Sequence, residues 1–193
     1  MNKITIFALL FVISLSSQTD QKIYNIIDAV SAKRIKNDIK ILTEFGTRNT
    51  FSDTISNTRG IGAARRWIKS EFETISKNCN NCIDVFYQKD FVTKKGNRRV
   101  PHDAWIVNVV AIQKGTKFPN RYIIMSGDID SRASNTMDFT SDAPGANDNA
   151  SGMAGTIEAA RVLSKYSFES SIVYVGLSGE EQGLFGGAGL AKY

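Results

Sequence analysis

Histidine and cysteine are almost absent from this 193-residue chain, which has only His102, Cys79 and Cys82. A Cys/His zinc knuckle needs two ligand pairs, so these residues exclude one. Proline is also scarce, with three residues against 15 glycines, and 42% of the residues are hydrophobic. Collagen-like, low-complexity and disordered chains are therefore excluded, and the composition is that of one compact α/β domain.

No apolar run is long enough to cross a bilayer, which takes roughly 20 residues. The apolar run at residues 4–15 follows Met1-Asn2-Lys3 and precedes a polar stretch. This layout is typical of a secretory signal peptide, so we predict one over residues 1–18. A buried N-terminal helix is the alternative. Residues 19–193 are then expected to be exported to the periplasm or the extracellular space, without a stable membrane anchor.

A long run of one charge is also missing. The formal net charge is +5, and this excess is spread among acidic residues, with local basic clusters only at residues 33–40, 65–66 and 94–99. Such clusters are typical of solvated faces, and no basic stripe interleaved with aromatic residues is present. We therefore predict no nucleic-acid partner, and the sequence gives no indication of the oligomeric state.

Cys79 and Cys82 are separated by two residues. Export would place them in an oxidising compartment, where this spacing favours a small local disulfide. A redox dithiol would lie between a strand and the start of a helix, whereas this pair follows a predicted helix and precedes a predicted strand.

The first part of the chain shows helical periodicity. Ser31 precedes apolar residues at helical spacing as far as Leu42, which predicts a helix that ends at Gly46. A second helix is predicted over residues 61–75, with a polar loop over residues 47–57 between the two.

Strands are predicted in the remainder. Residues 83–92 and 104–113 are rich in β-branched and aromatic residues, which predicts an antiparallel pair with its aromatic side chains in the core. Residues 122–125 and 172–175 are short apolar runs, as in parallel strands covered on both faces. The helical pattern of residues 149–165 supplies the crossover of a right-handed βαβ unit.

Acidic residues gather in the loops of this unit. Asp128 and Asp130 follow the first strand, Asp148 is expected at the helix N-terminus, and Glu180 and Glu181 follow the second strand. Loops at the carboxyl ends of parallel strands form the usual ligand crevice, and clustered carboxylates there need a cation or hydrogen-bond donors. We therefore predict a metal site. The alternative is a helix N-cap together with a solvated Glu-Glu turn.

These motifs carry a family resemblance. GDIDS at residues 127–131, APGANDNASG at residues 143–152 and GEEQGL at residues 179–184 resemble the co-catalytic zinc exopeptidases of metallopeptidase family 28, which includes bacterial leucyl aminopeptidase. The resemblance extends to residues 45–48 and 108–111. It implies a three-layer α/β/α domain whose mixed sheet has two antiparallel strands followed by parallel ones.

The resemblance also implies roles for the acidic residues and two divalent metal ions, normally zinc. Asp128 stands where the family has a histidine ligand, and Asp130 is the aspartate that orients this ligand. Asp148 is the aspartate that bridges the two ions. Glu180 is the general base and Glu181 a metal ligand, so the catalytic residues are Glu180 and Asp130.

The chain departs from the family pattern in two respects. Asp128 replaces a nitrogen ligand by a hard oxygen, which weakens the preference for zinc and admits manganese or magnesium. The family also takes an Asp and a His from later strands, whereas this sequence ends at Tyr193, and His102 is expected at the surface. We therefore expect residues 19–193 to be the N-terminal portion of a metallo-exopeptidase domain, truncated at its C-terminus, with an open sheet edge and little activity alone.

The leading functional hypothesis is an exported metallo-aminopeptidase that hydrolyses N-terminal residues from peptides. Glutaminyl cyclisation or carboxypeptidase action on the same scaffold is an alternative, because fold does not determine function. A catalytically inactive, peptide-binding pseudoenzyme is a third possibility. The replacement at Asp128 favours this last reading, whereas the presence of Glu180 favours an enzyme.

Overall fold

The computed structural model describes residues 20–193, so the predicted signal peptide lies outside the described residues. Two units are distinguished: one ends at Val30, and the other comprises Ser31–Tyr193. In the first, helix α2 (Gln21–Asp28) is capped by Asp20, whose side chain accepts a hydrogen bond from the Lys22 N–H at 2.9 Å. Over residues 20–193 the search for membrane-spanning helices finds no candidate.

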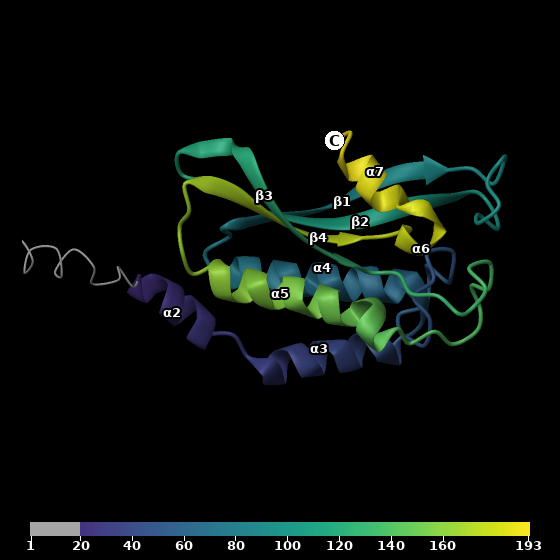
Figure 1. The fold of residues 1–193 in the computed structure, drawn as a ribbon, viewed down its shortest axis with the longest axis horizontal. Coiled ribbons are helices and arrows are strands. Elements are labelled where there is room, and N and C mark those ends of the chain that lie inside the picture. The colour runs from purple at the N-terminus through teal and green to yellow at the C-terminus, as the bar shows by residue number, and fades with distance from the viewer. Residues whose placement is uncertain (1–19) are drawn as a thin grey trace, which may run out of the picture. The chain divides into compact units, whose positions relative to one another are not determined.

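The second unit contains a four-stranded mixed sheet with helices on both faces (Figure 1). In chain order its elements are α3 (Ala32–Glu44), α4 (Gly60–Asn78), β1 (Ile83–Val92), β2 (Ala104–Gln113), β3 (Phe118–Asp128), the π-helical turn η1 (Ala146–Ala150), α5 (Ser151–Leu163), β4 (Ser170–Leu177), α6 (Glu180–Gly183) and α7 (Phe185–Leu190). The strand order is β1-β2-β4-β3. β1 and β2 are antiparallel, as are β2 and β4, whereas β3 and β4 are parallel. The predicted α/β class with a mixed sheet is confirmed.

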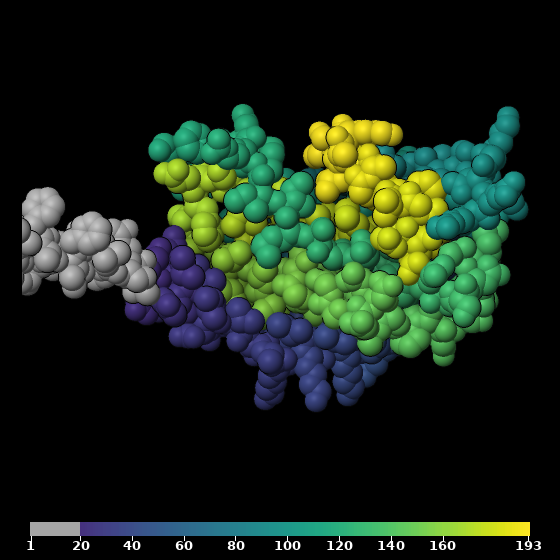
Figure 2. Space-filling view, in the orientation of Figure 1, coloured from purple at the N-terminus to yellow at the C-terminus, as the bar shows by residue number. Residues whose placement is uncertain are grey.

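Helices α4 and α5 cover one face of the sheet, and α3 packs outside them (Figure 1). The Ser31 hydroxyl accepts a hydrogen bond from the Arg34 N–H at 3.3 Å and so caps α3, as predicted. The core includes Ile61, Ile68 and Phe72 of α4, none of which is exposed. The short helix α7 lies on the opposite face, and the C-terminal residues cover only part of it (Figure 2).

The four strands occur along the chain where they were predicted, and the bounds of β1 and β2 are those predicted. β4 is buried on both faces, but β3 is not, because it lies at the edge of the sheet beside β4 alone. Ile123 and Ile124 of β3 are each 58% exposed. The prediction that both parallel strands are covered was therefore wrong for β3. Trp105, which is 57% exposed, likewise corrects the prediction that the aromatic residues of β1 and β2 are core.

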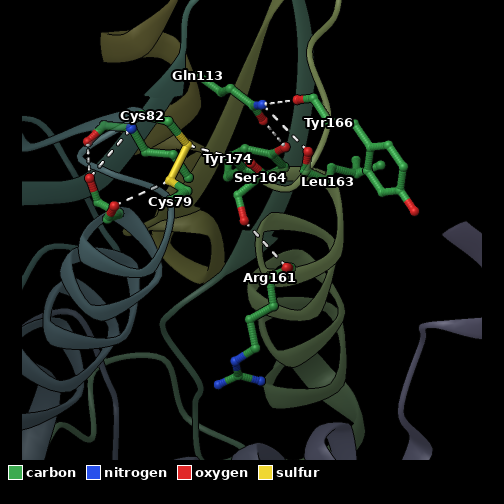
Figure 3. Close-up of a disulfide and its surroundings, with 10 residues drawn as sticks. Cys79, Cys82, Gln113, Arg161, Leu163, Ser164, Tyr166 and Tyr174 are labelled. Atoms are coloured by element: carbon green, nitrogen blue, oxygen red, sulfur yellow. Dashed lines mark hydrogen bonds between the residues drawn. A yellow bond between two sulfur atoms is a disulfide. The ribbon is translucent and has the colours of Figure 1, made fainter.

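Cys79 and Cys82 form the predicted disulfide (Figure 3). Cys79 is the C-cap of α4, and Cys82 directly precedes β1, so the bond closes the turn between helix and strand. The Ser76 hydroxyl supports the same turn by donating to the Ile83 carbonyl at 2.7 Å.

The start of α5 differs from the prediction. The helix begins at Ser151, after the turn η1, rather than at residue 149. Asp148 has extended dihedral angles (φ −115°, ψ 99°), and the peptide bond between Asp148 and Asn149 is cis. Asp148 therefore lies in a turn before the helix and is not its N-cap.

Candidate metal centre

The predicted site residues meet at one edge of the sheet, where β3 and β4 both end. Asp128 is the last residue of β3 and pairs with Leu177, the last residue of β4. Glu180 and Glu181 open α6, three and four residues beyond Leu177. The parallel arrangement of β3 and β4 thus brings together loops about 50 residues apart in the sequence.

Asp130 holds the backbone of the Glu-Glu turn. Its side chain is buried, and its two carboxylate oxygens accept hydrogen bonds from the N–H groups of Glu180 and Glu181, each at 3.3 Å. Burial raises the pKa of Asp130 to about 7, against the lowering effect of these bonds and of a bond from Thr50. Asp130 is therefore placed to orient the turn rather than to face solvent.

The other carboxylates repel one another. Burial raises the pKa of Asp128, and the negative charges of Glu180 and Asp148 raise it further. Burial also raises the pKa of Glu181, where Arg132 opposes the effect and the three other carboxylates add to it. A divalent cation would relieve this repulsion, and the oxygen-only donor set suits a hard metal ion.

These side chains do not converge on one point. Within residues 20–193, no group of three or more His, Cys, Asp or Glu side chains has the arrangement of a metal site. Glu181 instead pairs with Arg132, whose Nε lies 2.9 Å from Oε2 of Glu181. Asp148 is exposed. The carboxylates are suitable ligands for a divalent ion and lie near one another. Binding an ion would require Glu181 to give up its ion pair with Arg132.

Asn149 is an additional polar group at this edge. Its Nδ2 donates to Oδ2 of Asp128 at 3.4 Å, whereas its Oδ1 is buried and has no hydrogen-bond partner. A buried unpaired acceptor is costly, so this oxygen is a further ligand available to a cation or a donor at the site.

Arg48, which sequence reasoning did not assign to the site, connects two of its loops. It is 1% exposed, and its guanidinium donates to four backbone carbonyls. The acceptors are Ile129 at 2.8 Å, Leu42 at 3.0 Å, Pro144 at 2.6 Å and Gly145 at 3.0 Å. Burial lowers the pKa of Arg48 to about 10, so it remains charged at neutral pH. The loops that carry Asp130 and Asp148 are thereby fixed to one buried cation.

Thr50 contacts the Glu-Glu turn, whereas His102 lies at the surface. Thr50 Oγ1 accepts a hydrogen bond from the Gly179 N–H at 2.8 Å, directly before Glu180. Thr50 belongs to the predicted polar loop over residues 47–57, of which residues 47–52 are buried. His102 is exposed and packs edge-on against Phe51 and Phe139, so it lies at the surface as expected.

Comparison with known proteins supports the family resemblance of the sequence motifs. The sequence profile of "Peptidase family M28" matches residues 108–193. A protein of Pyrenophora teres f. teres named "Probable zinc metalloprotease" is 43% identical over 173 residues, which are 90% of this chain and 35% of that protein. A protein of Leptosphaeria maculans with a similar name is 42% identical over 89% of this chain and 39% of its own length. The chain thus spans little more than a third of these relatives.

Solved structures share the fold. The LapA aminopeptidase of Legionella pneumophila superposes with a TM-score of 0.68 at 20% identity, over 91% of this chain and 41% of that one. A glutaminyl cyclase of Fimbriiglobus ruber gives 0.61 at 21% identity, over 84% of this chain and 55% of that one. Residues 108–193, the segment that carries every predicted site residue, thus match peptidase family M28, the family that the sequence motifs resemble.

Proposed function

We propose that this chain belongs to an exported, metal-dependent peptide hydrolase that releases N-terminal residues from peptides. The match of residues 108–193 to family M28 and the relatives named zinc metalloproteases support a hydrolase that uses zinc. The observation that carries the proposal is the pair of hydrogen bonds from Glu180 and Glu181 to Asp130, since it holds two carboxylates side by side at the edge where β3 and β4 end. The Cys79–Cys82 disulfide supports export, because such bonds persist in oxidising compartments.

Each side chain has a part in the proposed reaction. Asp128, Asp148 and Glu181 hold two divalent ions, zinc in the first place, with manganese or magnesium admitted by Asp128. Such ions, when bound, polarise the scissile carbonyl and acidify water. Glu180 is not needed as a ligand, so its carboxylate takes the proton from the attacking water and passes it to the leaving amine. Asp130 holds Glu180 and Glu181 in position by accepting hydrogen bonds from their N–H groups.

The decisive experiment compares Glu180→Gln with Glu181→Gln in the full-length protein. We expect Glu180→Gln to retain its metals and to bind peptide as the wild type does, while turnover falls by about 10²–10⁴-fold, the usual contribution of a positioned acid or base. Glu181→Gln should lose activity together with metal, because a neutral amide is a poorer ligand than a carboxylate.

The substrates for this comparison are peptides with a free N-terminus, tested with zinc, manganese and cobalt. Equal turnover by wild type and Glu180→Gln would refute the proposed mechanism. Cyclisation of N-terminal glutamine without hydrolysis would favour a glutaminyl cyclase, and peptide binding without turnover would favour a binding module.

Metal binding is tested separately with Asp148→Asn. We expect this variant to lose the most metal, because a bridging carboxylate serves both ions. Asp142→Asn is the matched control: Asp142 precedes the same turn, is exposed and pairs with Arg59 at 2.7 Å. Metal content after dialysis distinguishes the two variants, and an unchanged stoichiometry in Asp148→Asn would remove Asp148 from the site.

A further inference from the structure

A cavity with a volume of about 520 Å³ lies between α4 and the strands β1 and β2. Its walls include the cations Arg65, Arg66 and Lys89 and the aromatic residues Phe51, Tyr87 and Trp105. Trp105 belongs to the start of β2, and β2 runs antiparallel to β4, so the cavity opens near the edge at which β4 ends. This volume is typical of a small-ligand site.

Arg65 is a buried cation without a counter-ion. The residue is 7% exposed, and its Nε donates to the carbonyl of Ile61, one turn earlier in α4, at 3.2 Å. Among residues 20–193, no carboxylate lies within 4.0 Å of its guanidinium, and no hydrogen-bond acceptor engages Nη1 or Nη2. Burial lowers the pKa of Arg65 to about 10, so it stays protonated at neutral pH. Although the residue as a whole is buried, Nη1 and Nη2 are not among the buried side-chain atoms that lack a partner, so they reach the water of the cavity and are accessible to an anion.

The surroundings of Arg65 are positive. None of the residues that line the cavity is an Asp or a Glu. Arg66 is fixed in place by donating to the carbonyls of Thr54 and Ile55, at 2.8 Å and 3.2 Å, and the carboxylate near it, Asp53, does not line the cavity. Burial raises the pKa of Tyr87, so its phenol is neutral and cannot serve as the missing anion.

The remaining walls are apolar or aromatic. Trp105 is 57% exposed, and its ring meets that of Phe91 at a centroid distance of 5.2 Å. Phe51 belongs to a small buried cluster with Val100 and Ile106. An occupant would therefore meet a guanidinium fork at depth and aromatic surface nearer to solvent.

We propose that this cavity binds a carboxylate joined to an apolar or aromatic body, with the carboxylate on Nη1 and Nη2 of Arg65. The two free guanidinium nitrogens match a planar carboxylate in bidentate geometry. Lys89 adds a second positive charge, and Trp105 contacts the apolar body. The inference concerns a second site and does not rest on the proposed hydrolase function.

Two hydrogen bonds connect the cavity to the edge of the sheet where β3 and β4 end. Thr50 and Val107 both line it. Thr50 Oγ1 accepts from the Gly179 N–H, and the Val107 carbonyl accepts from the Ser178 hydroxyl, both at 2.8 Å. Both partners directly precede Glu180, so an occupant lies next to the wall that supports the Glu-Glu turn.

The test measures binding to the full chain with N-acetyl-phenylalanine as probe, by calorimetry and by tryptophan fluorescence, to which Trp67 and Trp105 both contribute. N-acetyl-phenylalaninamide, which has the same body without the charge, should bind at least 10-fold more weakly. Arg65→Met should weaken binding of the acid at least 10-fold, and Lys89→Met several-fold. Arg121→Met is the matched control, because Arg121 is exposed on β3 and does not line the cavity.

Equal affinity for acid and amide would overturn the proposal, as would an unchanged affinity in folded Arg65→Met. Should Arg65→Met fail to fold, Lys89→Met and the comparison of acid with amide on the wild type decide the matter. Inorganic phosphate that binds more tightly than the acid would also overturn it. A tripeptide that ends in phenylalanine, compared with its C-terminal amide, identifies the source: tighter binding than that of the single amino acid points to a peptide C-terminus, and weaker binding to a free small acid.

Discussion

The N–H group of Glu181 donates to Oδ2 of Asp130 at 3.3 Å, which joins the first residues of α6 to the segment that follows β3. The neighbouring N–H, that of Glu180, uses the other carboxylate oxygen. Because each N–H group uses a different oxygen of Asp130, the one carboxylate holds the two glutamates at once.

Asp130→Asn is therefore expected to loosen the Glu-Glu turn without removing a ligand. One amide oxygen replaces two acceptors, and the amide NH₂ faces a backbone donor. We expect turnover to fall about 10–100-fold, the usual effect of losing a residue that orients a metal site. KM should change little. Steady-state kinetics and metal analysis of the same preparation check this.

The control for this experiment is Asp84→Asn, a change at an exposed aspartate whose only ion pair is with Lys114, also exposed, among the described residues. It should leave turnover unchanged. Wild-type turnover in Asp130→Asn would contradict a positioning role, and a loss of metal comparable to that of Asp148→Asn would make Asp130 a ligand.

Arg48→Met is expected to destabilise the fold more than any exposed arginine substitution. The change leaves four carbonyls without this donor, of which those of Leu42 and Ile129 are buried and those of Pro144 and Gly145 are part-buried. Each unsatisfied buried acceptor costs about 1–3 kcal/mol, so a loss of at least about 3 kcal/mol in the free energy of unfolding is expected. Urea denaturation measures it, with Arg121→Met as the exposed control. A midpoint equal to that of the control would show that water replaces the guanidinium without cost.

Much of the fold could be predicted because its signals are local. The β-branched and aromatic residues of segments 83–92 and 104–113 favour two strands whatever surrounds them, and Ser31 caps α3 through a bond to Arg34, three residues away. The exposure of β3 has no such local signal in the sequence. Its apolar run resembles that of β4, and only the position at the sheet edge decides that Ile123 is exposed.

The site was predicted in part for the same reason. The order of the acidic motifs along a βαβ unit indicated that Asp128, Asp148 and Glu180 lie close together. In the structure, the negative charges of Glu180 and Asp148 raise the pKa of Asp128. Arg48 and Thr50 could not be found in this way, since their segment is polar and reads as a surface loop. Their burial depends on carbonyl and N–H groups more than 80 residues away.

The disulfide is expected to make a small contribution to stability. It closes a loop with a sequence separation of three residues, for which the entropy model gives about 2 kcal/mol, less than the roughly 3 kcal/mol of a 15-residue loop. The double variant Cys79→Ser/Cys82→Ser should fold and lose no more than this. Thiol counting on denatured, unreduced protein checks the bond itself, and two free thiols in exported material would contradict it.

The pH dependence of stability should carry opposite contributions from two buried acids that bind Arg161. Burial raises the pKa of Glu158, but hydrogen bonds from Arg34, Ser31 and Arg161 outweigh it, so the net pKa lies below 4.5. For Asp38, burial outweighs its bond to Arg161, and the pKa lies above 3.8. The two acids lie in contact with one guanidinium, at 3.4 Å and 2.6 Å.

The signs follow from proton linkage. The unfolded chain protonates Glu158 more readily than the folded one, so the contribution of Glu158 is present above pH 4.5 and is lost as the pH falls through its lowered pKa. The folded chain protonates Asp38 more readily, so stability from Asp38 is gained over the same fall. Between about pH 5 and pH 3, Glu158→Gln should therefore lose less stability than the wild type, and Asp38→Asn should lose more. Urea denaturation across this range measures the slopes, which do not depend on the fixed cost of either substitution. Parallel slopes in all three proteins would mean that neither acid titrates differently in the folded and unfolded chains.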